Sequence, residues 1–135
     1  MKNTLSAIAP LVLAGVGIRV TNGTVSFSGV LAMRDPSDTI TPFLKQVHLA
    51  AIESGTRRLM VDLTDLKFMN SSSIRSLVDW IEWIRQEEPP KQYVIHFKMK
   101  SDVTWQITTM DAIQCLGGKY VAVEGGTHGY VDQPA

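Results

Sequence analysis

Three consecutive serines follow an asparagine at Asn70-Ser71-Ser72-Ser73, between an apolar run and a strongly amphipathic segment. One Asn or Ser is enough to cap a helix, and Asn70 suits that role. The other hydroxyls are then available for chemistry. A helix N-terminus offers free N–H groups and the positive end of the helix dipole, which favour a phosphate. A serine in the first turn is thus a candidate phosphoacceptor, because an added charge of about −1.5 to −2 would be partly neutralised there.

The same residues also fit a purely structural role. In that interpretation Asn70 caps the helix, and the three serines form its first turn, where free amide groups need partners. Residue type and spacing alone favour neither interpretation.

Other kinds of chemistry have less support in the sequence. Ser71 lies outside the Gly-x-Ser-x-Gly pattern of a hydrolase nucleophile, and no Gly-x-x-x-x-Gly-Lys loop is present. The scattered histidines do not have the spacing of metal ligands. Asp62 and Asp65 are expected to cap and solvate the exit of a strand. We therefore expect a protein that is not an enzyme and has no metal or cofactor.

The surrounding patterns place the serines in an α/β domain. Asn22-Gly23, between two alternating segments, predicts a β-hairpin over 18–31. Apolar runs predict strands at 59–63, 93–97 and 120–123, and helical spacing predicts helices between Pro36 and Gly55, from Ser71 to Arg85, and between Ser101 and Gly117. This order predicts one domain with a mixed, mainly parallel sheet, an opening hairpin and about three packed helices.

The domain is expected to span residues 18–124. Residues 1–17 carry one lysine and a broken apolar run, which favours an added strand or helix of the fold over an export signal. Residues 125–135 are rich in glycine and polar residues and predict a flexible tail.

The charge balance, the length of the apolar runs and the single cysteine limit the kinds of partner and compartment that we expect. Thirteen basic residues balance thirteen acidic ones, which argues against a protein that grips a nucleic-acid backbone. The apolar runs are too short to span a membrane. Cys115 is the single cysteine, so no intrachain disulfide can form, and we expect it to be buried and inert in a reducing, cytoplasmic compartment.

The stretch from Asp62 to Ile74, Asp-Leu-Thr-Asp-Leu-Lys-Phe-Met-Asn-Ser-Ser-Ser-Ile, resembles the signature of the STAS domain family. That family includes bacterial anti-sigma factor antagonists and the cytoplasmic domains of sulphate transporters. Its usual pattern is a strand ending in Asp-Leu-Ser/Thr, then an aromatic-aliphatic pair and Asp-Ser-Ser/Thr-Gly-Leu/Ile. The segment Ser26-Phe27-Ser28-Gly29-Val30-Leu31 is similar to the early Ser-Gly-Glu-Leu strand of the family, and the later elements come in the same order.

The resemblance implies a switch that depends on protein binding. In antagonists of this family, an anti-sigma factor that is also a kinase phosphorylates the serine after the acidic residue, and a phosphatase resets it. The matching position here is Ser71, and Ser72 is the second choice. The expected partners are therefore an anti-sigma factor or similar serine kinase and a phosphatase, with neither nucleic acid nor membrane.

Two positions depart from the family pattern. Asn70 stands where the family usually has aspartate, and Ser73 where it usually has glycine. Asn70 keeps the cap but cannot be an anion or a base. The alternative interpretation is accordingly a scaffold or ligand-sensing module of the same fold that is not phosphorylated, and a less favoured one is a nucleotide-binding or enzymatic domain.

The helix after the serines carries two tryptophans. If Ile74, Leu77, Val78, Ile81 and Ile84 form its inward face, Trp80 lies at the edge of that face and Trp83 nearly opposite. Outward tryptophans are candidate interface anchors. We therefore expect Trp80, Trp83 and Met69 to belong to a partner-binding surface, with a homodimer as an alternative use of the same face.

Overall fold

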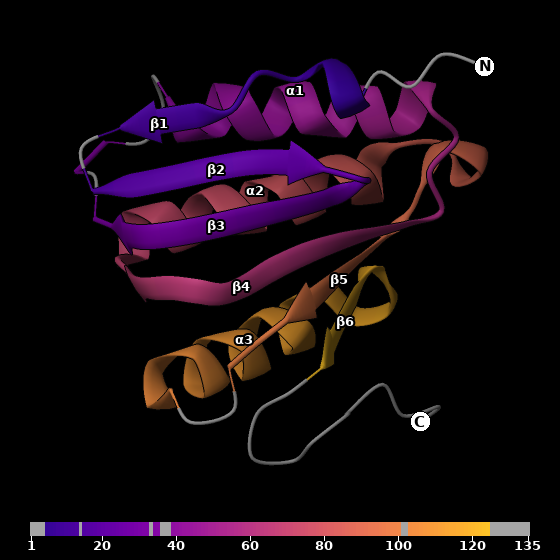
Figure 1. Ribbon diagram of the computed structural model, residues 1–135. Coiled ribbons are helices and arrows are strands. Elements are labelled where there is room, and N and C mark those ends of the chain that lie inside the picture. The colour runs from indigo at the N-terminus through magenta and orange to yellow at the C-terminus, as the bar shows by residue number, and fades with distance from the viewer. Residues whose placement is uncertain (1–4, 14, 33, 36–38, 101–102, 125–135) are drawn as a thin grey trace.

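The computed structural model describes residues 5–13, 15–32, 34–35, 39–100 and 103–124 of the chain. Within these residues, six strands and three α-helices form one α/β domain (Figure 1). The strands are β1 (Leu11–Leu13), β2 (Val16–Thr21), β3 (Thr24–Leu31), β4 (Arg58–Met69), β5 (Val94–Lys98) and β6 (Val121–Glu124). The helices are α1 (Ile40–Glu53), α2 (Ser71–Gln86) and α3 (Thr104–Gly117), with short 3₁₀ turns η1 (Leu5–Ala7), η3 (Pro89–Lys91) and η4 (Gly118–Tyr120).

The order of strands in the sheet follows their order in the chain, from β1 to β6. β1, β2 and β3 pair antiparallel, whereas β3, β4, β5 and β6 pair parallel. Asn22 and Gly23 take positive φ values of 53° and 76° at the turn between β2 and β3, as a two-residue hairpin requires. The predicted fold class, a mixed and mainly parallel sheet with an opening hairpin and three helices, is confirmed.

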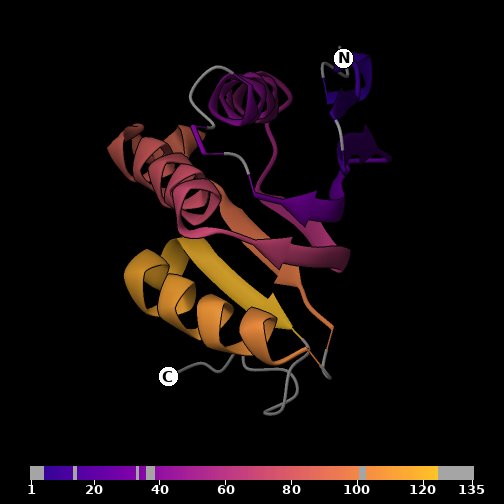
Figure 2. The ribbon, with the colours of Figure 1, turned by 90° about the vertical axis from the view of Figure 1, so that its left-hand side faces the viewer.

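All three helices cover the same face of the sheet (Figure 2). This follows from the strand order, because crossovers of one hand that always advance to the next strand place each helix on one side. Val25, Val61 and Phe97 are register partners on the covered face and are fully buried. The next row, Ser26, Asp62 and Lys98, points to the opposite face.

The uncovered face is polar over most of its area, which is unusual because parallel strands are normally buried on both faces. A row of hydrogen bonds crosses the three last strands there. Arg58 of β4 donates to Nδ1 of His96 on β5, and His96 Nε2 lies 2.6 Å from Glu124 Oε1 on β6. On this face the side chains of β4, β5 and β6 form hydrogen bonds with each other, and no helix of the described residues covers them.

The N-terminal segment adds to the same core. Leu5 of η1 and Ile8 are buried, and β1 pairs with β2 at the edge of the sheet. The expected flexible tail, 125–135, lies outside the described residues.

Two expectations about burial are wrong. The buried side of α2 consists of Ser73, Ser76, Leu77, Trp80, Ile81 and Ile84, whereas Ile74 and Val78 are only half-buried. The inward face is rotated because α2 packs against α1 as well as the sheet, and the small Ser73 and Ser76 allow a close approach. Cys115 is exposed on α3, since that helix buries Met110 and Ile113 instead.

Candidate functional site at the start of helix α2

The chain turns from β4 into α2 at a single residue, Asn70. Its backbone is extended, with φ −82° and ψ 172°, and its N–H donates to the carbonyl oxygen of Leu31 on β3 at 2.9 Å. Its side-chain Oδ1 accepts a hydrogen bond from the Ser73 N–H at 3.0 Å. Asn70 is therefore the N-cap of α2 and ties the start of the helix to the sheet.

The three serines have different surroundings. Ser71 is exposed and Ser72 is half-buried, whereas Ser73 points into the core. Among the described residues, the Ser73 hydroxyl has no hydrogen-bond partner. Only Ser71 and Ser72, the two residues considered as phosphoacceptors, present hydroxyls that a partner can reach.

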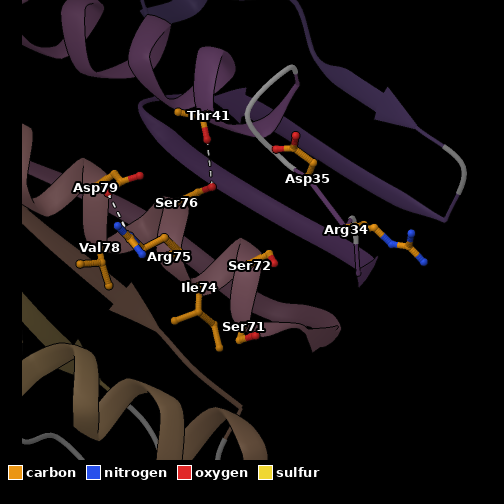
Figure 3. Close-up of a pocket in the computed structure, with 10 residues that line it drawn as sticks. All are labelled: Arg34, Asp35, Thr41, Ser71, Ser72, Ile74, Arg75, Ser76, Val78 and Asp79. Atoms are coloured by element: carbon orange, nitrogen blue, oxygen red, sulfur yellow. Dashed lines mark hydrogen bonds and ion pairs between the residues drawn. The ribbon is translucent and has the colours of Figure 1, made fainter.

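Both of these serines line a surface pocket of about 680 Å³ (Figure 3). The pocket lies between the start of α2, the start of α1 and the segment that follows β3. A hydrogen bond of 3.0 Å between Thr41 Oγ1 and Ser76 Oγ joins the two helices beside it. Its lining is formed by Arg34, Asp35, Thr41, Ser71, Ser72, Ile74, Arg75, Ser76, Val78 and Asp79.

The charges around the pocket are mixed. Arg75 Nε lies 3.6 Å from Asp79 Oδ1 one turn further along α2, and both side chains are largely exposed, 78% and 44%. Arg34 and Asp35 face α2 from the segment after β3, and the guanidinium of Arg34 points away from the helix (Figure 3). With two arginines and two aspartates, the pocket has no strong preference for one sign of charge.

An apolar patch lies at the carboxyl ends of β3 and β4, the end of the sheet at which α2 begins. It consists of Val30, Phe68 and Trp105, and we call it the Phe68 patch. Val30 and Phe68 are register partners that are 43% and 46% exposed, and the rings of Phe68 and Trp105 are 6.2 Å apart. Trp105 is held by a hydrogen bond of 2.8 Å from its Nε1 to the Lys67 carbonyl.

Sequence reasoning missed the Phe68 patch because it ended the strand at residue 63. The strand in fact continues to Met69, and the alternation of a strand places Phe68 opposite the buried Met69. The alternation is interrupted before Leu66, which is buried, so the exposure of Phe68 could not be predicted from the period of the strand alone.

The expected interface anchors are mostly wrong. Trp80 is 0% exposed, and its Nε1 donates to the Tyr93 hydroxyl at 2.8 Å. Met69 is buried as well. Trp83 is half-buried, packs on the core and lies under the Lys45 ammonium at 4.5 Å. The buried Trp80 and Met69 are therefore not available to anchor a partner, whereas a partner contact of the half-buried Trp83 stays a prediction.

Asp62 and Asp65 lie at an irregularity of strand β4. The register of β4 against β3 shifts between Asp62 and Asp65. Asp62 Oδ1 accepts hydrogen bonds from the Thr64 N–H and hydroxyl, at 2.9 and 2.6 Å. From α3, Gln106 Nε2 donates to the carbonyl oxygens of Leu63 and Leu66. The Asp-Leu-Thr-Asp segment is therefore an irregularity of β4 that is stabilised by the Asp62 side chain and by Gln106 of α3.

The described part of the chain gives little support for a metal site or a membrane-spanning helix. No group of three His, Cys, Asp or Glu side chains there is placed to hold a metal ion. None of its helices combines the length and apolar character that crossing a membrane requires. The sheet also has no point at which the strand order reverses, where α/β proteins usually form a ligand crevice.

No family model matches the chain, and no curated protein matches it significantly.

Proposed function

We propose that this chain is a cytoplasmic, phosphorylation-dependent protein-binding domain similar to the STAS anti-sigma factor antagonists. Its partner would be an anti-sigma factor with serine kinase activity, and a phosphatase would reverse the modification. Ser71 is the first-choice phosphoacceptor and Ser72 the second.

One observation carries the proposal. The buried strand β4 passes directly into α2, and the first turn of α2 presents Ser71 and Ser72 at a surface pocket while Asn70 caps the helix. A phosphate on either serine would meet free N–H groups and the positive end of the helix dipole. The modification thus changes the charge of the surface without requiring the fold to move.

The binding surface would combine polar and apolar parts. The pocket beside the serines supplies arginine, aspartate and hydroxyl groups, and the Phe68 patch supplies apolar area three residues before Ser71. A partner seated on both would bury the serines. A phosphate of about −1.5 to −2 charge inside that contact would then have to be desolvated, which would expel the partner.

The chemistry of transfer places one requirement on the kinase. The serine oxygen bonds to the γ-phosphorus of ATP, ADP leaves, and the hydroxyl proton passes to a base. Asn70 cannot serve as this base because it is an amide whose oxygen is already bonded to the Ser73 N–H. The proposal therefore assigns the base to a residue other than Asn70, which the partner kinase would supply.

The test has two steps in the native host. Intact-mass measurement and site mapping would show whether Ser71 or Ser72 carries phosphate. Tagged wild type, Ser71→Ala and Ser71→Asp would then be used to recover partners, with Thr108→Asp on exposed α3 as the control for added charge.

We expect Ser71→Ala and Thr108→Asp to recover a protein that phosphorylates the wild type from ATP, and Ser71→Asp to lose it. Equal recovery by Ser71→Asp and Ser71→Ala, or transfer to a residue other than Ser71 or Ser72, would contradict the proposal.

A second candidate function is favoured by the residues at the cap. Asn70 and Ser73 replace the aspartate and glycine of the family pattern, and the Ser73 side chain fills space next to the sheet. Both changes keep the shape of the turn while removing features of the phosphorylated antagonists. A constitutive scaffold or ligand-sensing domain of the same fold would show no phosphate in the host and would bind its partner through the same surface.

A further inference from the structure

Arg75 lies on α2 between an acidic residue, Asp79, and the two serines that could carry a phosphate. Asp79, one turn later, is its present ion-pair partner, with Arg75 Nε 3.6 Å from Asp79 Oδ1. Ser71 and Ser72 lie four and three residues before it, which places them beside Arg75 on the helix surface. All four residues line the same pocket (Figure 3).

The present ion pair is poorly favoured. Both side chains are largely exposed, so water weakens their attraction. The order of the charges is also the weaker one, because a helical pair is more stable when the acid precedes the base by four residues. In the unmodified chain the Arg75 guanidinium is turned toward Asp79 (Figure 3). Side chains of a helix generally tilt toward its N-terminus, so a rotation of the exposed Arg75 side chain toward the serines agrees with this general direction.

A phosphate on Ser71 would reverse the order of the charges and strengthen the attraction to Arg75. The acid would then precede the base in the favoured order, and it would carry up to twice the charge of a carboxylate. Arginine also presents a planar fork of donors that matches phosphate oxygens.

We propose that Arg75 is a charge-exchange residue: it binds the phosphate placed on Ser71 or Ser72 and leaves Asp79 in doing so. This inference rests on the proposed function. It adds that phosphorylation changes the surface at two places, because the phosphate is partly neutralised by Arg75 while the Asp79 carboxylate is released one turn along the pocket. A partner that had bound Arg75 through an acidic group would lose that contact as well.

The exchange can be tested without any kinase, by incorporating phosphoserine at position 71 or 72 during translation. Failure of the native partner to phosphorylate the chain would then leave this test unaffected. The ³¹P signal of the phosphoserine is titrated in the full chain and in Arg75→Gln, Arg34→Gln and Arg85→Gln. Arg85 is the matched control, since it lies on the same helix and pairs with Glu82 at 3.4 Å, far from the serines.

We expect Arg75→Gln to move the midpoint of the ³¹P titration to higher pH by about 0.2–0.4 pH unit, because loss of the cation favours the protonated phosphate. Arg34→Gln and Arg85→Gln should leave the midpoint unchanged. A shift caused by Arg34→Gln instead, or equal shifts in all three variants, would overturn the proposal.

The departure from Asp79 has its own readout, the Nε–H signal of Arg75. In the unmodified protein, Asp79→Asn should move this signal. In the phosphoprotein the signal should follow the phosphate titration and no longer respond to Asp79→Asn. A signal that responds to Asp79→Asn equally in both forms would show that Arg75 keeps its original partner.

Discussion

His48 Nε2 lies 2.9 Å from Glu87 Oε2, which joins the middle of α1 to the end of α2 through a fully buried imidazole. The other ring nitrogen, Nδ1, lies 2.8 Å from the Tyr93 hydroxyl. Trp80 Nε1 donates to that same hydroxyl. Four side chains from α1, α2 and the residues after α2 thus form one chain of hydrogen bonds in the core.

The donors and acceptors in this chain of hydrogen bonds determine which ring nitrogen of His48 carries the proton. A carboxylate can only accept, so His48 Nε2 carries a proton and donates to Glu87. Nδ1 of the neutral ring then accepts from the Tyr93 O–H, whose oxygen accepts from Trp80. A second proton on His48 would turn Nδ1 into a donor and leave the Tyr93 hydrogen without its acceptor.

Acid should therefore destabilise the fold through His48. Burial lowers the pKa of His48 below its ordinary value, an effect that the hydrogen bond to Glu87 only partly offsets. Because the unfolded chain then binds the proton more readily, stability is complete above about pH 6.5 and falls as the pH drops toward the folded-state pKa. Urea unfolding between pH 7.5 and 5.5 should show the loss, at no more than about 1.4 kcal/mol per pH unit for this one group.

Two variants separate His48 from the other histidines. His48→Gln should flatten the dependence on pH, whereas His96→Gln, on the open face of the sheet, should preserve it. Stability that is constant over this range in the wild type would contradict the assigned protonation.

The same network should also lose stability in alkali. Burial raises the pKa of Tyr93 above its ordinary value of about 10, so the unfolded chain loses this proton more readily than the folded chain. The free energy of unfolding should therefore fall as the pH rises above about 10.

Local signals in the sequence predicted much of the fold. Asn22-Gly23 marks the hairpin because few other pairs tolerate positive φ at both positions. The change of period from strand to helix at Asn70 marks the turn that carries Ser71. Each of these features depends on residues that are adjacent in the chain, so it can be predicted from a single sequence.

The orientation of α2 could not be predicted in the same way. Its rotation depends on α1, where His48 bonds Glu87 directly and is joined to Trp80 through the Tyr93 hydroxyl. It also depends on the small Ser76, which bonds Thr41. These contacts join residues 13 to 45 positions apart in the chain. Apolar spacing within one helix carries no information about them, which is why Trp80 was wrongly placed at the surface.

Ser73→Ala should stabilise the protein. The Ser73 hydroxyl is fully buried and has no hydrogen-bond partner among the described residues, so the fold bears the cost of removing it from water. Alanine keeps the Cβ and has a higher helix propensity. We expect a gain of about 1 kcal/mol in the free energy of unfolding, measured with urea. Ser71→Ala, at an exposed position, is the control, and a loss of stability in Ser73→Ala would mean that the hydroxyl is paired after all.

Gly29→Ala should destabilise the protein by about 3 kcal/mol. Gly29 has φ +86°, and a Cβ there would lie 2.0 Å from the Gly15 carbonyl oxygen, which accepts the Val30 N–H at 2.7 Å. Gly23 is the matched control, since it has φ +76° but open space around its Cβ position. Gly23→Ala should cost only about 1 kcal/mol for the left-handed backbone. Equal losses in the two variants would show that the contact with Gly15 relaxes freely.

An acidic and a basic residue at position 71 should change the free energy of unfolding in opposite directions. Ser71 is the first residue of α2 and is exposed, so an anion there meets the positive end of the helix dipole without being desolvated. Ser71→Asp should therefore raise the free energy of unfolding by about 0.5 kcal/mol, and Ser71→Lys should lower it by a similar amount. Both effects should fade in 1 M salt, since about 3 Å of screening length remains there. The same pair at Thr108, in the middle of α3, should show no such opposition. If Ser71→Asp were as destabilising as Ser71→Lys, the start of α2 would not accept an anion, and the phosphate proposed for this position would disturb the fold itself.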